Sequence, residues 1–550
     1  MDLGVILPES RIDAMREAGL WPDRTVLDYL DDAVAAAPAQ TAITGYDGER
    51  GEVVRLSYGE LDALSRRIAL KLLQLGIGAG DVVSLQLPNW WQFAAMHLGC
   101  ARIGAITNPL MPIFRERELG FMLGFAETRL LVAPERFRGF DYRPMIDGLR
   151  GELPALRHAV YAGAAGADGF DAVFLAEPLE DAPEADAILA GRRPGANDVV
   201  ELIYTSGTTG QPKGVMHTSN TTIGHLALWI EHHGLGRDDV ILMASPLAHQ
   251  TGFLYGLLLP VMLGAEVVLM DRWEPPRAAE IIQQHRCSFT MAATPFLSDI
   301  VHMPNVADFD LSSLRTFVSA GAPIPPALVQ DAARGFAFKV LSGWGMTECA
   351  CPTICNPDDA DERVWSSDGA PMRGAEVKVV DEAGREQPAG EEGDLKFRGS
   401  SLFVGYLKKP ELHGLDADGW FDTGDRARID GKGYIRISGR SKDIIIRGGE
   451  NVPVVELEDV LYRHPAVQDV AVVGVPDDRL GERGCAYVTL KADGELSMEV
   501  LRQYLEDSGT AKQYWPEMLE VIDEMPRTPS GKIQKFKLRQ RAEALTPDRA

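Results

Sequence analysis

Apolar and polar residues follow two different periods along the chain. From Ser57, the run SYGELDALSRRIALKLLQLG places apolar residues every three to four positions, which predicts a helix. Ser57 and Glu60 form a capping box at its start, and Gly76 ends it. The run DVVSLQLPN that follows from Asp81 predicts a short strand. This alternation of helix and strand recurs through the first four fifths of the chain and is typical of α/β proteins.

The pattern changes twice towards the C-terminus. After Pro371, short β-like runs such as AEVKVVDE and GDLKFRG lie between turn residues, which predicts a small, mostly β unit. The segment GRSKDIIIRGGENVP from Gly439 then leads to a helix at residues 456–462 and a strand at residues 470–475. We therefore expect an N-terminal domain over residues 1–440 and a compact C-terminal domain over residues 441–550.

The most apolar stretch runs from Phe253 to Met270. Pro260, Gly264 and Glu266 interrupt it, so it predicts a buried helix, a turn and a strand better than a membrane span. We expect no transmembrane segment.

Size, composition and charge narrow the class of protein. The chain has 550 residues, which is enough for two to four folding units, with 45% hydrophobic and 25% charged residues, as in a globular protein. The formal net charge of -25 argues against nucleic acid or an anionic membrane as a partner. The six cysteines are sparse, and the N-terminus lacks the pattern of a signal peptide, so we expect a reducing cytoplasm.

The strongest chemical signal is the segment TSGTTGQPKG, which follows the β-like run ELIY. Its glycines allow backbone N–H groups to approach a phosphate closely, its hydroxyls add donors, and its lysine adds positive charge. It differs from the common nucleotide-binding loop GxxxxGK[ST], because Gln and Pro follow its second glycine and a glycine follows its lysine. The sequence therefore predicts a phosphate cradle made by Thr205, Ser206, Gly207, Thr208, Thr209, Gly210 and Lys213.

This segment resembles the phosphate-binding signature of the adenylate-forming superfamily, which includes acyl-CoA synthetases, luciferases and nonribosomal peptide adenylation domains. The resemblance implies a large N-terminal domain of two α/β subdomains plus a β unit, and a smaller mobile C-terminal α/β domain. It also implies ATP, Mg²⁺ and coenzyme A, and an AMP-forming carboxylic acid–CoA ligase that works through an acyl adenylate.

Further motifs follow in the order that this superfamily shows. GWGMTE, from Gly343 through Gly345 to Glu348, is similar to its aromatic-Gly-x-Thr-Glu element. The resemblance implies that Trp344 stacks on adenine, that Thr347 meets phosphate, and that Glu348, together with Thr208, binds Mg²⁺. Members of the superfamily usually have Tyr at the position of Trp344, so a phenolic hydrogen bond is lost here.

Two segments resemble the nucleoside-binding parts of the superfamily. VSAGAP ends with Gly321, Ala322 and Pro323, which by resemblance line adenine and the acyl carbonyl. GWFDTGD and GYIRISGR match the ribose-binding pair, since Asp425 can accept hydrogen bonds from both ribose hydroxyls and Arg440 offers a fork of donors.

The C-terminal motifs imply a hinge and a catalytic lysine. By resemblance, Lys442 is the hinge residue, and Gly448 and Gly449 leave a narrow passage for the pantetheine arm of coenzyme A. PRTPSGKIQK resembles the catalytic-lysine motif, in which Lys532 stabilises charge while the carboxylate attacks the α-phosphate.

The acyl site is the least specific part of the sequence. SPLAHQTGF resembles the gate beside the acyl pocket, although His249 could also be an ordinary core histidine. The expected lining is mostly apolar, which favours a medium-chain, alicyclic or aromatic acid. The substrate-contacting residues that we expect are His249, Thr251, Phe253, Ser319 and Ala320.

Three cysteines next to the expected Mg²⁺ ligand are spaced as in some metal-binding motifs. No fourth Cys or His ligand follows Cys349, Cys351 and Cys355 nearby, so packing beside the site is the favoured interpretation over structural zinc or iron–sulfur.

Three alternative functions stay open at this point. The first is an acyl-adenylating enzyme that delivers to a carrier protein, or an amino-acid adenylation unit, and the latter would show pyrophosphate exchange with amino acids. A luciferase-like oxygenase would emit light or take up oxygen. A silent nucleotide-binding regulator would form no AMP with any acid. The oligomeric state is also open, with a homodimer among the candidates.

Overall fold

The structure is a computed structural model of the 550-residue chain. It describes all residues except Met1 and residues 206–211, 322–323, 441–444, 448–449, 453, 478–480, 493, 509, 511, 529–530 and 546–550. The side chains of Arg440, Ile446, Glu450, Asn451, Glu456, Gln513 and residues 543–545 are also outside the described part.

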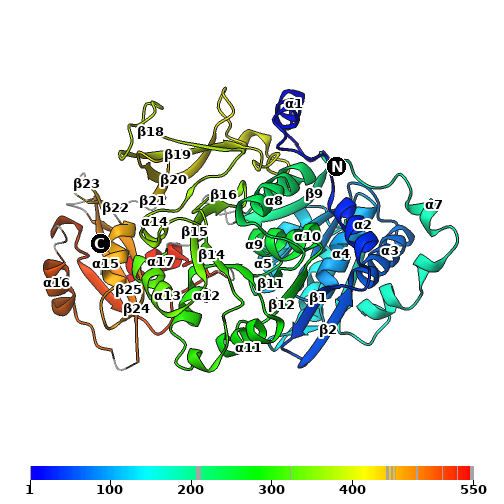
Figure 1. Ribbon diagram of the computed structural model, residues 1–550, viewed down its shortest axis with the longest axis horizontal. Coiled ribbons are helices and arrows are strands. Elements are labelled where there is room, and N and C mark those ends of the chain that lie inside the picture. Colours follow the sequence, from blue (N-terminus) through cyan, green and yellow to red (C-terminus); the bar gives the residue numbers. More distant parts are fainter. Residues whose placement is uncertain are drawn as a thin grey trace.

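Two large sheets form the centre of the N-terminal domain (Figure 1). The first has nine described strands in the order β17-β16-β15-β14-β13-β11-β12-β1-β2. Its strands from β15 to β1 are parallel, with antiparallel strands at both edges. Their bounds are β1 Thr41–Asp47, β2 Glu52–Ser57, β11 Val240–Met243, β12 Glu266–Met270, β13 Phe289–Ala292, β14 Thr316–Ala320, β15 Lys339–Met346, β16 Ala350–Ile354 and β17 Ala370–Pro371.

The second sheet has six described strands in the order β10-β9-β4-β3-β5-β8. It is parallel except for β10, which forms an antiparallel hairpin with β9. Its strands are β3 Val82–Leu85, β4 Ile106–Pro109, β5 Leu130–Pro134, β8 His158–Ala162, β9 Val199–Thr205 and β10 Lys213–Thr218, and a separate pair comprises β6 Arg136–Phe137 and β7 Phe140–Asp141.

Helices cover the faces of both sheets, and some pack against both. Thus α4 contacts β4 of the second sheet and β1 of the first. The helices of this domain are α1 Glu9–Glu17, α2 Val26–Ala36, α3 Tyr58–Gln74, α4 Trp91–Arg102, α5 Glu116–Phe125, α6 Tyr142–Leu149, α7 Ala185–Leu189, α8 Ser219–His233, α9 Gln250–Gly252, α10 Leu259–Leu263, α11 Pro275–His285, α12 Thr294–Val301, α13 Pro326–Gly335 and α14 Asp361–Ser366.

Local signals in the sequence explain several of these elements. Helix α3 begins after Ser57, whose hydroxyl accepts from the Glu60 backbone N–H at 3.3 Å, so the predicted capping box is confirmed. The apolar stretch after Gly252 forms the π-helix η4 (Phe253–Leu258), then α10 and β12, with Gly264 in the left-handed region between them. No helix among the described residues is long and apolar enough to cross a membrane.

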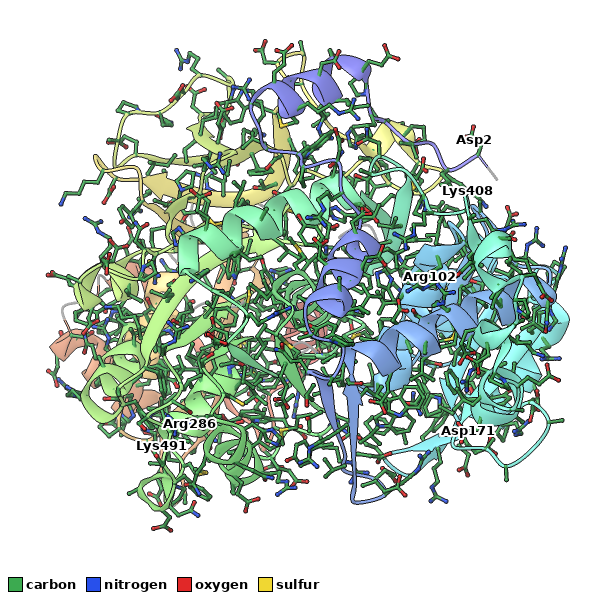
Figure 2. All side chains as sticks on the ribbon, turned by 45° about the vertical axis from the view of Figure 1, so that its right-hand side comes forward. Asp2, Arg102, Asp171, Arg286, Lys408 and Lys491 are labelled. Carbon is green, nitrogen blue, oxygen red and sulfur yellow. The ribbon has the colours of Figure 1, made fainter. Side chains whose placement is uncertain are left out.

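The predicted β unit is a four-stranded antiparallel sheet in the order β18-β19-β20-β21. It lies at the top of Figure 1, and its buried residues, among them Phe397, Phe421 and Ile435, form one core with Ile203 of β9 and Trp344 of β15. The N-terminal segment runs beside the connection between β19 and β20, and Figure 2 shows Asp2 near Lys408, whose N–H donates to Leu3 O at 2.9 Å. The strands are β18 Ala375–Val380, β19 Glu392–Gly399, β20 Phe421–Ile429 and β21 Ile435–Arg440.

A smaller α/β domain forms the C-terminal end, at the left of Figure 1. Its helix α15 begins two residues before the predicted start, and β24 is longer than predicted because it pairs along its whole length with β25. The expected fold class, a large N-terminal domain with a small C-terminal domain, is confirmed. The elements are β22 Ile445–Arg447, β23 Glu450–Val452, α15 Val454–Tyr462, β24 Val467–Asp477, β25 Gly481–Leu490, α16 Met498–Asp507, β26 Met518–Val521 and α17 Lys535–Leu545.

Candidate active site

The β9–β10 hairpin carries the expected phosphate cradle. Thr205, the last residue of β9, is paired with Lys213, the first residue of β10. The hairpin therefore holds the threonine and the lysine of the motif opposite each other. Five other predicted cradle residues lie outside the described residues, namely Ser206, Gly207, Thr208, Thr209 and Gly210.

Tyr406 connects this hairpin with the motif GWGMTE. Its hydroxyl donates to Glu348 Oε1 at 2.8 Å, and Lys213 Nζ lies 4.7 Å from the centre of its ring. Burial, together with the charge of Glu348, raises the pKa of Tyr406, so its hydroxyl keeps its proton and acts as a donor. Glu348 is only 5% exposed. A carboxylate, a phenol and an ammonium group thus come together from three separate segments.

The main chain around Thr347 is fixed from β10. His217 Nε2 lies 2.8 Å from Thr347 O, and His217 Nδ1 lies 3.0 Å from Thr221 Oγ1. Burial lowers the pKa of His217 to about 4, so the ring is neutral at neutral pH. Neither Tyr406 nor His217 was predicted, since a lone tyrosine or histidine in an apolar run has the same pattern as an ordinary core residue.

Trp344 and Asp425 form a buried pair. Trp344 Nε1 donates to Asp425 Oδ2 at 2.9 Å, and the two residues are 7% and 4% exposed. Although the phenolic bond expected of a tyrosine is absent at a tryptophan, the indole supplies a hydrogen bond of its own. Asp425 also lies opposite Arg440, the other residue of the predicted ribose-binding pair, in the pairing of β20 with β21, but the Arg440 side chain is outside the described part.

Lys532 reaches from the C-terminal domain to the end of β14. A Cβ built on Gly321 would lie 3.5 Å from Lys532 Cε. Gly321 has φ +86°, a conformation that favours glycine, so the chain turns here with no side chain between it and the lysine. Thr528 Oγ1 accepts from the Lys532 backbone N–H at 3.0 Å, and Gly531 packs on α12. These contacts hold Lys532 beside the ends of the parallel strands.

His249 lies within the electrostatic reach of Lys532. Burial, reinforced by the positive charge of Lys532, lowers the pKa of His249 to about 3, so this imidazole is neutral at neutral pH. His249 Nδ1 accepts from the Thr251 backbone N–H at 3.3 Å and begins the short helix α9. Phe253 is fully buried, with its ring 4.8 Å from that of His97.

The ends of β14 and β15 lie side by side, and their residues make close contacts on both faces of the sheet. Ala320 is paired with Gly343, and the Ser319 hydroxyl lies 3.5 Å from that of Thr294 on α12. A Cβ on Gly343 would come 3.0 Å from Cys351 Sγ, and one on Gly345 would come 2.0 Å from Ala350 O. Only glycine therefore fits at either position without displacement of its neighbours.

Some predicted residues cannot be placed. Ala322, Pro323, Lys442, Gly448 and Gly449 lie outside the described residues. The other predicted residues of the nucleotide and acyl sites lie on β9 and β10, at or just after the ends of β14 and β15, on β20, at α9 and the start of η4, and in the loop before α17.

The cysteines beside Glu348 are packed in the core. Cys349, Cys351 and Cys355 are free and buried, and Cys355 Sγ lies 3.5 Å from Ser367 Oγ. Burial raises the pKa of Cys355 to about 11. No group of three or more His, Cys, Asp or Glu residues in the described part of the chain could hold a metal ion.

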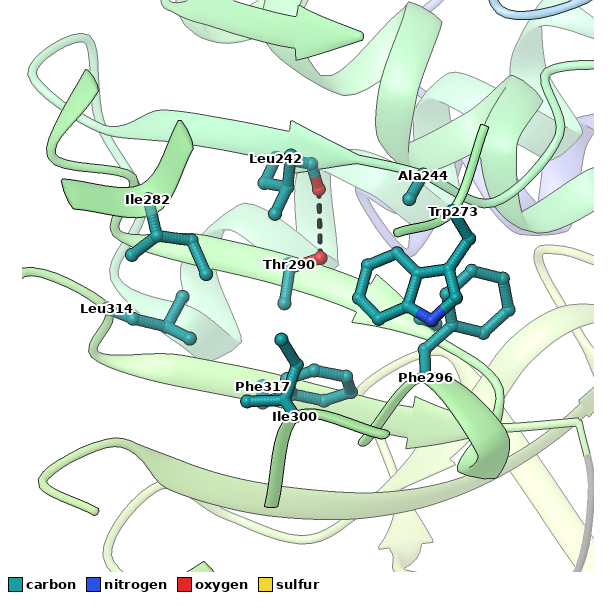
Figure 3. Close-up of a pocket in the computed structure, with 10 residues that line it drawn as sticks. Leu242, Ala244, Trp273, Ile282, Thr290, Phe296, Ile300, Leu314 and Phe317 are labelled. Atoms are coloured by element: carbon teal, nitrogen blue, oxygen red, sulfur yellow. Dashed lines mark hydrogen bonds between the residues drawn. The ribbon is translucent and has the colours of Figure 1, made fainter. Parts of the chain in front are cut away.

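A small apolar pocket lies elsewhere, between the first sheet and helices α11 and α12 (Figure 3). Its single hydroxyl, on Thr290, already donates to Leu242 O at 2.9 Å. The pocket therefore offers no free polar group to orient a substrate. It is lined by Leu242, Ala244, Trp273, Ile282, Thr290, Ala292, Phe296, Ile300, Leu314 and Phe317.

Comparison with known proteins agrees with this geometry. The family model of AMP-binding enzymes matches residues 30–407, and that of the AMP-binding enzyme C-terminal domain matches residues 456–532. The medium-chain fatty-acid–CoA ligase of Escherichia coli K12 is 37% identical over 542 residues, which cover 98% of this chain and 94% of that protein.

Two further proteins show the range of relatives. The 3-[(3aS,4S,7aS)-7a-methyl-1,5-dioxo-octahydro-1H-inden-4-yl]propanoyl:CoA ligase of Rhodococcus jostii RHA1 is 33% identical over 497 residues, covering 88% of this chain and 94% of the relative. The crystal structure of the anthranilate CoA ligase AuaEII in complex with anthranoyl-AMP has a TM-score of 0.84 and 26% identity, covering 96% of this chain and 99% of that one. The chain belongs to the AMP-binding enzyme family, and the resemblance to the acyl-CoA synthetase branch of the adenylate-forming superfamily is confirmed.

Proposed function

We propose that the protein joins a carboxylic acid to coenzyme A in two steps, with ATP as the source of energy. The reaction class, an AMP-forming acid–thiol ligase, follows from the family and from relatives named as CoA ligases. The structural observation that carries the proposal is the position of Lys532, which crosses from the C-terminal domain to Gly321 and the neighbourhood of His249.

In the first step, a carboxylate oxygen attacks the α-phosphorus of ATP. The bond from that phosphorus to the bridging oxygen breaks, and pyrophosphate leaves with the electron pair. Lys532 stabilises the negative charge that grows on the α-phosphate, because its ammonium group is held at the ends of the strands before the reaction begins. Thr205, Lys213 and residues 206–210 hold the phosphates.

Glu348 fits the requirements of a magnesium ligand. Mg²⁺ prefers oxygen ligands and is often held by one or two carboxylates together with substrate phosphates. Glu348 is a buried carboxylate whose Oε1 is oriented by Tyr406. We assign Glu348 and Thr208 to this ion, which offsets phosphate charge when bound.

The nucleoside contacts are assigned to four segments. Asp425 and Arg440 bind the ribose, Trp344 stacks on adenine, and the backbone of residues 321–323 lines the adenine and the acyl carbonyl. The hydrogen bond from Trp344 to Asp425 supports this assignment, because it joins the proposed adenine and ribose contacts in one rigid unit.

The acyl group is placed between α8, α9 and the ends of β14 and β15. We propose that His249, Thr251, Phe253 and Ala320 contact it with their side chains, and that Ser319, whose hydroxyl lies 3.5 Å from that of Thr294 on α12, contributes its backbone. Relatives named for a medium-chain fatty acid, a dioxo-octahydroindenyl propanoate and anthranilate support a medium-chain, alicyclic or aromatic acid.

In the second step, the thiol of coenzyme A gives up its proton to solvent, the thiolate attacks the acyl carbonyl, the carbon–oxygen bond to phosphate breaks, and AMP leaves with the electron pair. We propose that the domain of residues 441–550 first rotates relative to residues 1–440 about Lys442, so that Lys532 withdraws. Gly448 and Gly449 would then leave room for the pantetheine arm. Arg436 Nη2 lies 3.0 Å from Asp459 Oδ2 across the two domains, and such a polar contact can be exchanged for contacts with water when the domains separate.

Two properties of the whole molecule are also proposals. Six free, buried cysteines support a cytoplasmic location, where thiols stay reduced. A homodimer is the assembly to test first, because two-fold dimers are the commonest soluble oligomers. Light scattering on the purified protein would decide this point.

The decisive experiment measures AMP released from ATP and coenzyme A with a panel of acids. We expect release with medium-chain, cyclohexane-type or aromatic acids, and none without an acid. Failure of every acid to yield AMP would overturn the proposed function. Release of AMP that needs an amino acid and no coenzyme A would point to an amino-acid adenylation unit instead.

A further inference from the structure

Helix α8 carries a row of buried ring side chains. His225, Trp229 and His233 follow one another at intervals of four residues, so they lie along one face of the helix. The ring centres of Trp229 and His233 are 4.3 Å apart, and those of Trp229 and Tyr255 are 4.6 Å apart. Tyr255 belongs to η4, the segment that follows His249.

This row contains polar atoms that lack partners within the described part of the chain. Trp229 is fully buried, and its Nε1 makes no hydrogen bond there. The same holds for both ring nitrogens of His233, which are buried. By contrast, His225 Nε2 and the Tyr255 hydroxyl lie 2.8 Å apart and satisfy each other.

Within the described residues, the indole N–H groups of five other tryptophans have hydrogen-bond acceptors, unlike that of Trp229. The Nε1 atoms of five of them each donate to an oxygen at 2.8 to 2.9 Å. A buried N–H without an acceptor costs free energy, and such groups are therefore rare in folded proteins. An unpaired indole N–H in this place indicates an acceptor that arrives from outside the chain. The five are Trp21, Trp90, Trp273, Trp344 and Trp515.

The unpaired atoms lie on the acyl side of the first sheet. Side chains alternate between the two faces of a strand, and Phe317 of β14 lines the pocket near α12. Ala320 therefore points to the opposite face, as does its neighbour Gly343, which approaches Cys351. Tyr255 is also in contact with Cys351, through a hydrogen bond to its backbone. The row on α8 is thus continuous with the ends of β14 and β15.

Helix α8 begins near Thr347, one of the residues proposed to meet phosphate, and leads away from it. Thr221 contacts His217, which in turn contacts Thr347. Trp229 is eight residues further along α8, which corresponds to about 12 Å along the helix axis. A group bound at Trp229 therefore lies well away from the carboxyl carbon that is activated.

The Trp229 indole N–H and the neutral His233 ring are suited to bind an uncharged oxygen atom of a ligand. The Trp229 indole offers one N–H, and burial keeps the His233 imidazole neutral, with one donor and one acceptor nitrogen. An anionic group would lose its hydration here without a cation among the neighbours of Trp229 named above. A keto or hydroxyl oxygen can accept from the indole and exchange a hydrogen bond with the imidazole.

We propose, on the basis of the CoA-ligase function above, that the acid substrate carries a keto or hydroxyl oxygen at the end remote from its carboxylate, and that Trp229 and His233 bind this oxygen. The two residues then determine specificity without taking part in the chemistry. They reject the plain hydrocarbon acid because it leaves their buried nitrogens unpaired.

The test compares acids that differ only in the remote oxygen. Octanoate, 7-oxooctanoate and 7-hydroxyoctanoate are one series, and cyclohexanecarboxylate and 4-oxocyclohexanecarboxylate are another. For the wild-type enzyme, we expect kcat/KM for CoA-dependent AMP release to favour an oxygenated acid by roughly 10- to 100-fold. The oxo and hydroxy arms show which oxygen is preferred.

Two variants assign the preference to the row on α8. Trp229→Phe keeps an aromatic ring but removes the N–H, and His233→Leu removes both nitrogens at a different turn of the helix. Each variant is expected to lose most of the preference and to retain AMP release with the hydrocarbon acid. Trp273→Phe is the matched control, because its Nε1 donates to Asp299 at 2.8 Å on the other face of the sheet. This control should keep the wild-type preference.

The outcomes separate this inference from the proposed function. Equal kcat/KM for octanoate and its oxygenated analogues, or a preference that survives in both α8 variants, would overturn the inference and leave the ligase function intact. No AMP with any acid would overturn both. A preference that Trp229→Phe or His233→Leu removes, and that Trp273→Phe retains, supports the inference.

Discussion

The indole N–H of Trp344 donates to the carboxylate of Asp425 at 2.9 Å, in a site where both residues are almost fully buried. The bond joins two segments that are 81 residues apart in the chain. A carboxylate that must accept hydrogen bonds from two ribose hydroxyls gains a fixed orientation from such a donor. The aromatic residue thus has a second proposed role besides stacking on adenine.

Removing the indole N–H should weaken the recognition of ribose. In Trp344→Phe, a ring remains for stacking, but Asp425 loses its donor. We expect KM for ATP to rise roughly tenfold, the scale of one hydrogen bond to a charged group, with a smaller change in kcat. The ratio of kcat/KM for ATP to that for 2′-deoxy-ATP should fall towards one. An unchanged ratio would mean that the bond only stabilises the fold.

Removing the ammonium group of Lys532 should separate the two half-reactions. In Lys532→Ala, we expect formation of the acyl adenylate to slow by roughly 10² to 10³, the scale for one lost transition-state partner. Thioester formation from supplied acyl-AMP should continue at the wild-type rate. Lys537→Ala is the control, since Lys537 is an exposed lysine five residues later. Equal loss in both half-reactions would contradict the assignment of Lys532.

Short motifs predicted the parts of the site that depend on local chemistry. The start of α3 follows from Ser57 and Glu60, and the motif PRTPSGKIQK led us to expect a role for Lys532 but not its place beside Gly321. The contact of Tyr406 with Glu348 joins segments that are 58 residues apart, so no local pattern reveals it. The orientation of Trp229 depends likewise on how α8 packs against η4 and the first sheet.

The Tyr406 hydroxyl should influence the affinity for magnesium. Tyr406→Phe keeps the ring beside Lys213 but removes the hydrogen bond to Glu348 Oε1. Loss of a partner that orients a metal ligand commonly weakens metal affinity by roughly 10- to 100-fold. We expect the Mg²⁺ concentration for half-maximal adenylation to rise accordingly at saturating ATP. Tyr434→Phe, which removes a hydroxyl bonded to Asp359 away from this site, should leave the Mg²⁺ dependence unchanged.

The contact between Arg436 and Asp459 should make domain docking depend on pH. Burial raises the pKa of Asp459 to about 7, and the negative charges of Glu458 and Asp368 add to this rise. The positive charges of Arg436 and Arg463 act in the opposite direction but do not cancel it. If rotation of the C-terminal domain exposes Asp459, its pKa returns to about 4. The docked arrangement then binds the proton more tightly, so it is favoured as the pH falls from 7 towards 4 and loses this advantage as the pH rises through 7.

This dependence can be measured by attaching a donor and an acceptor dye to the two domains. We expect the docked fraction of the free enzyme to decrease between about pH 5 and pH 7 and to level off above pH 7. The asparagine side chain cannot ionise, so in Asp459→Asn the docked fraction should not change with pH between about pH 5 and pH 7. Its level differs from that of the wild type only by the loss of the charge pair with Arg436. The exposed pair of Arg16 with Asp23 offers a control, since Asp23→Asn should leave the curve unchanged. A docked fraction that increases with pH would show that the ion pair with Arg436, rather than the burial of Asp459, dominates the contact.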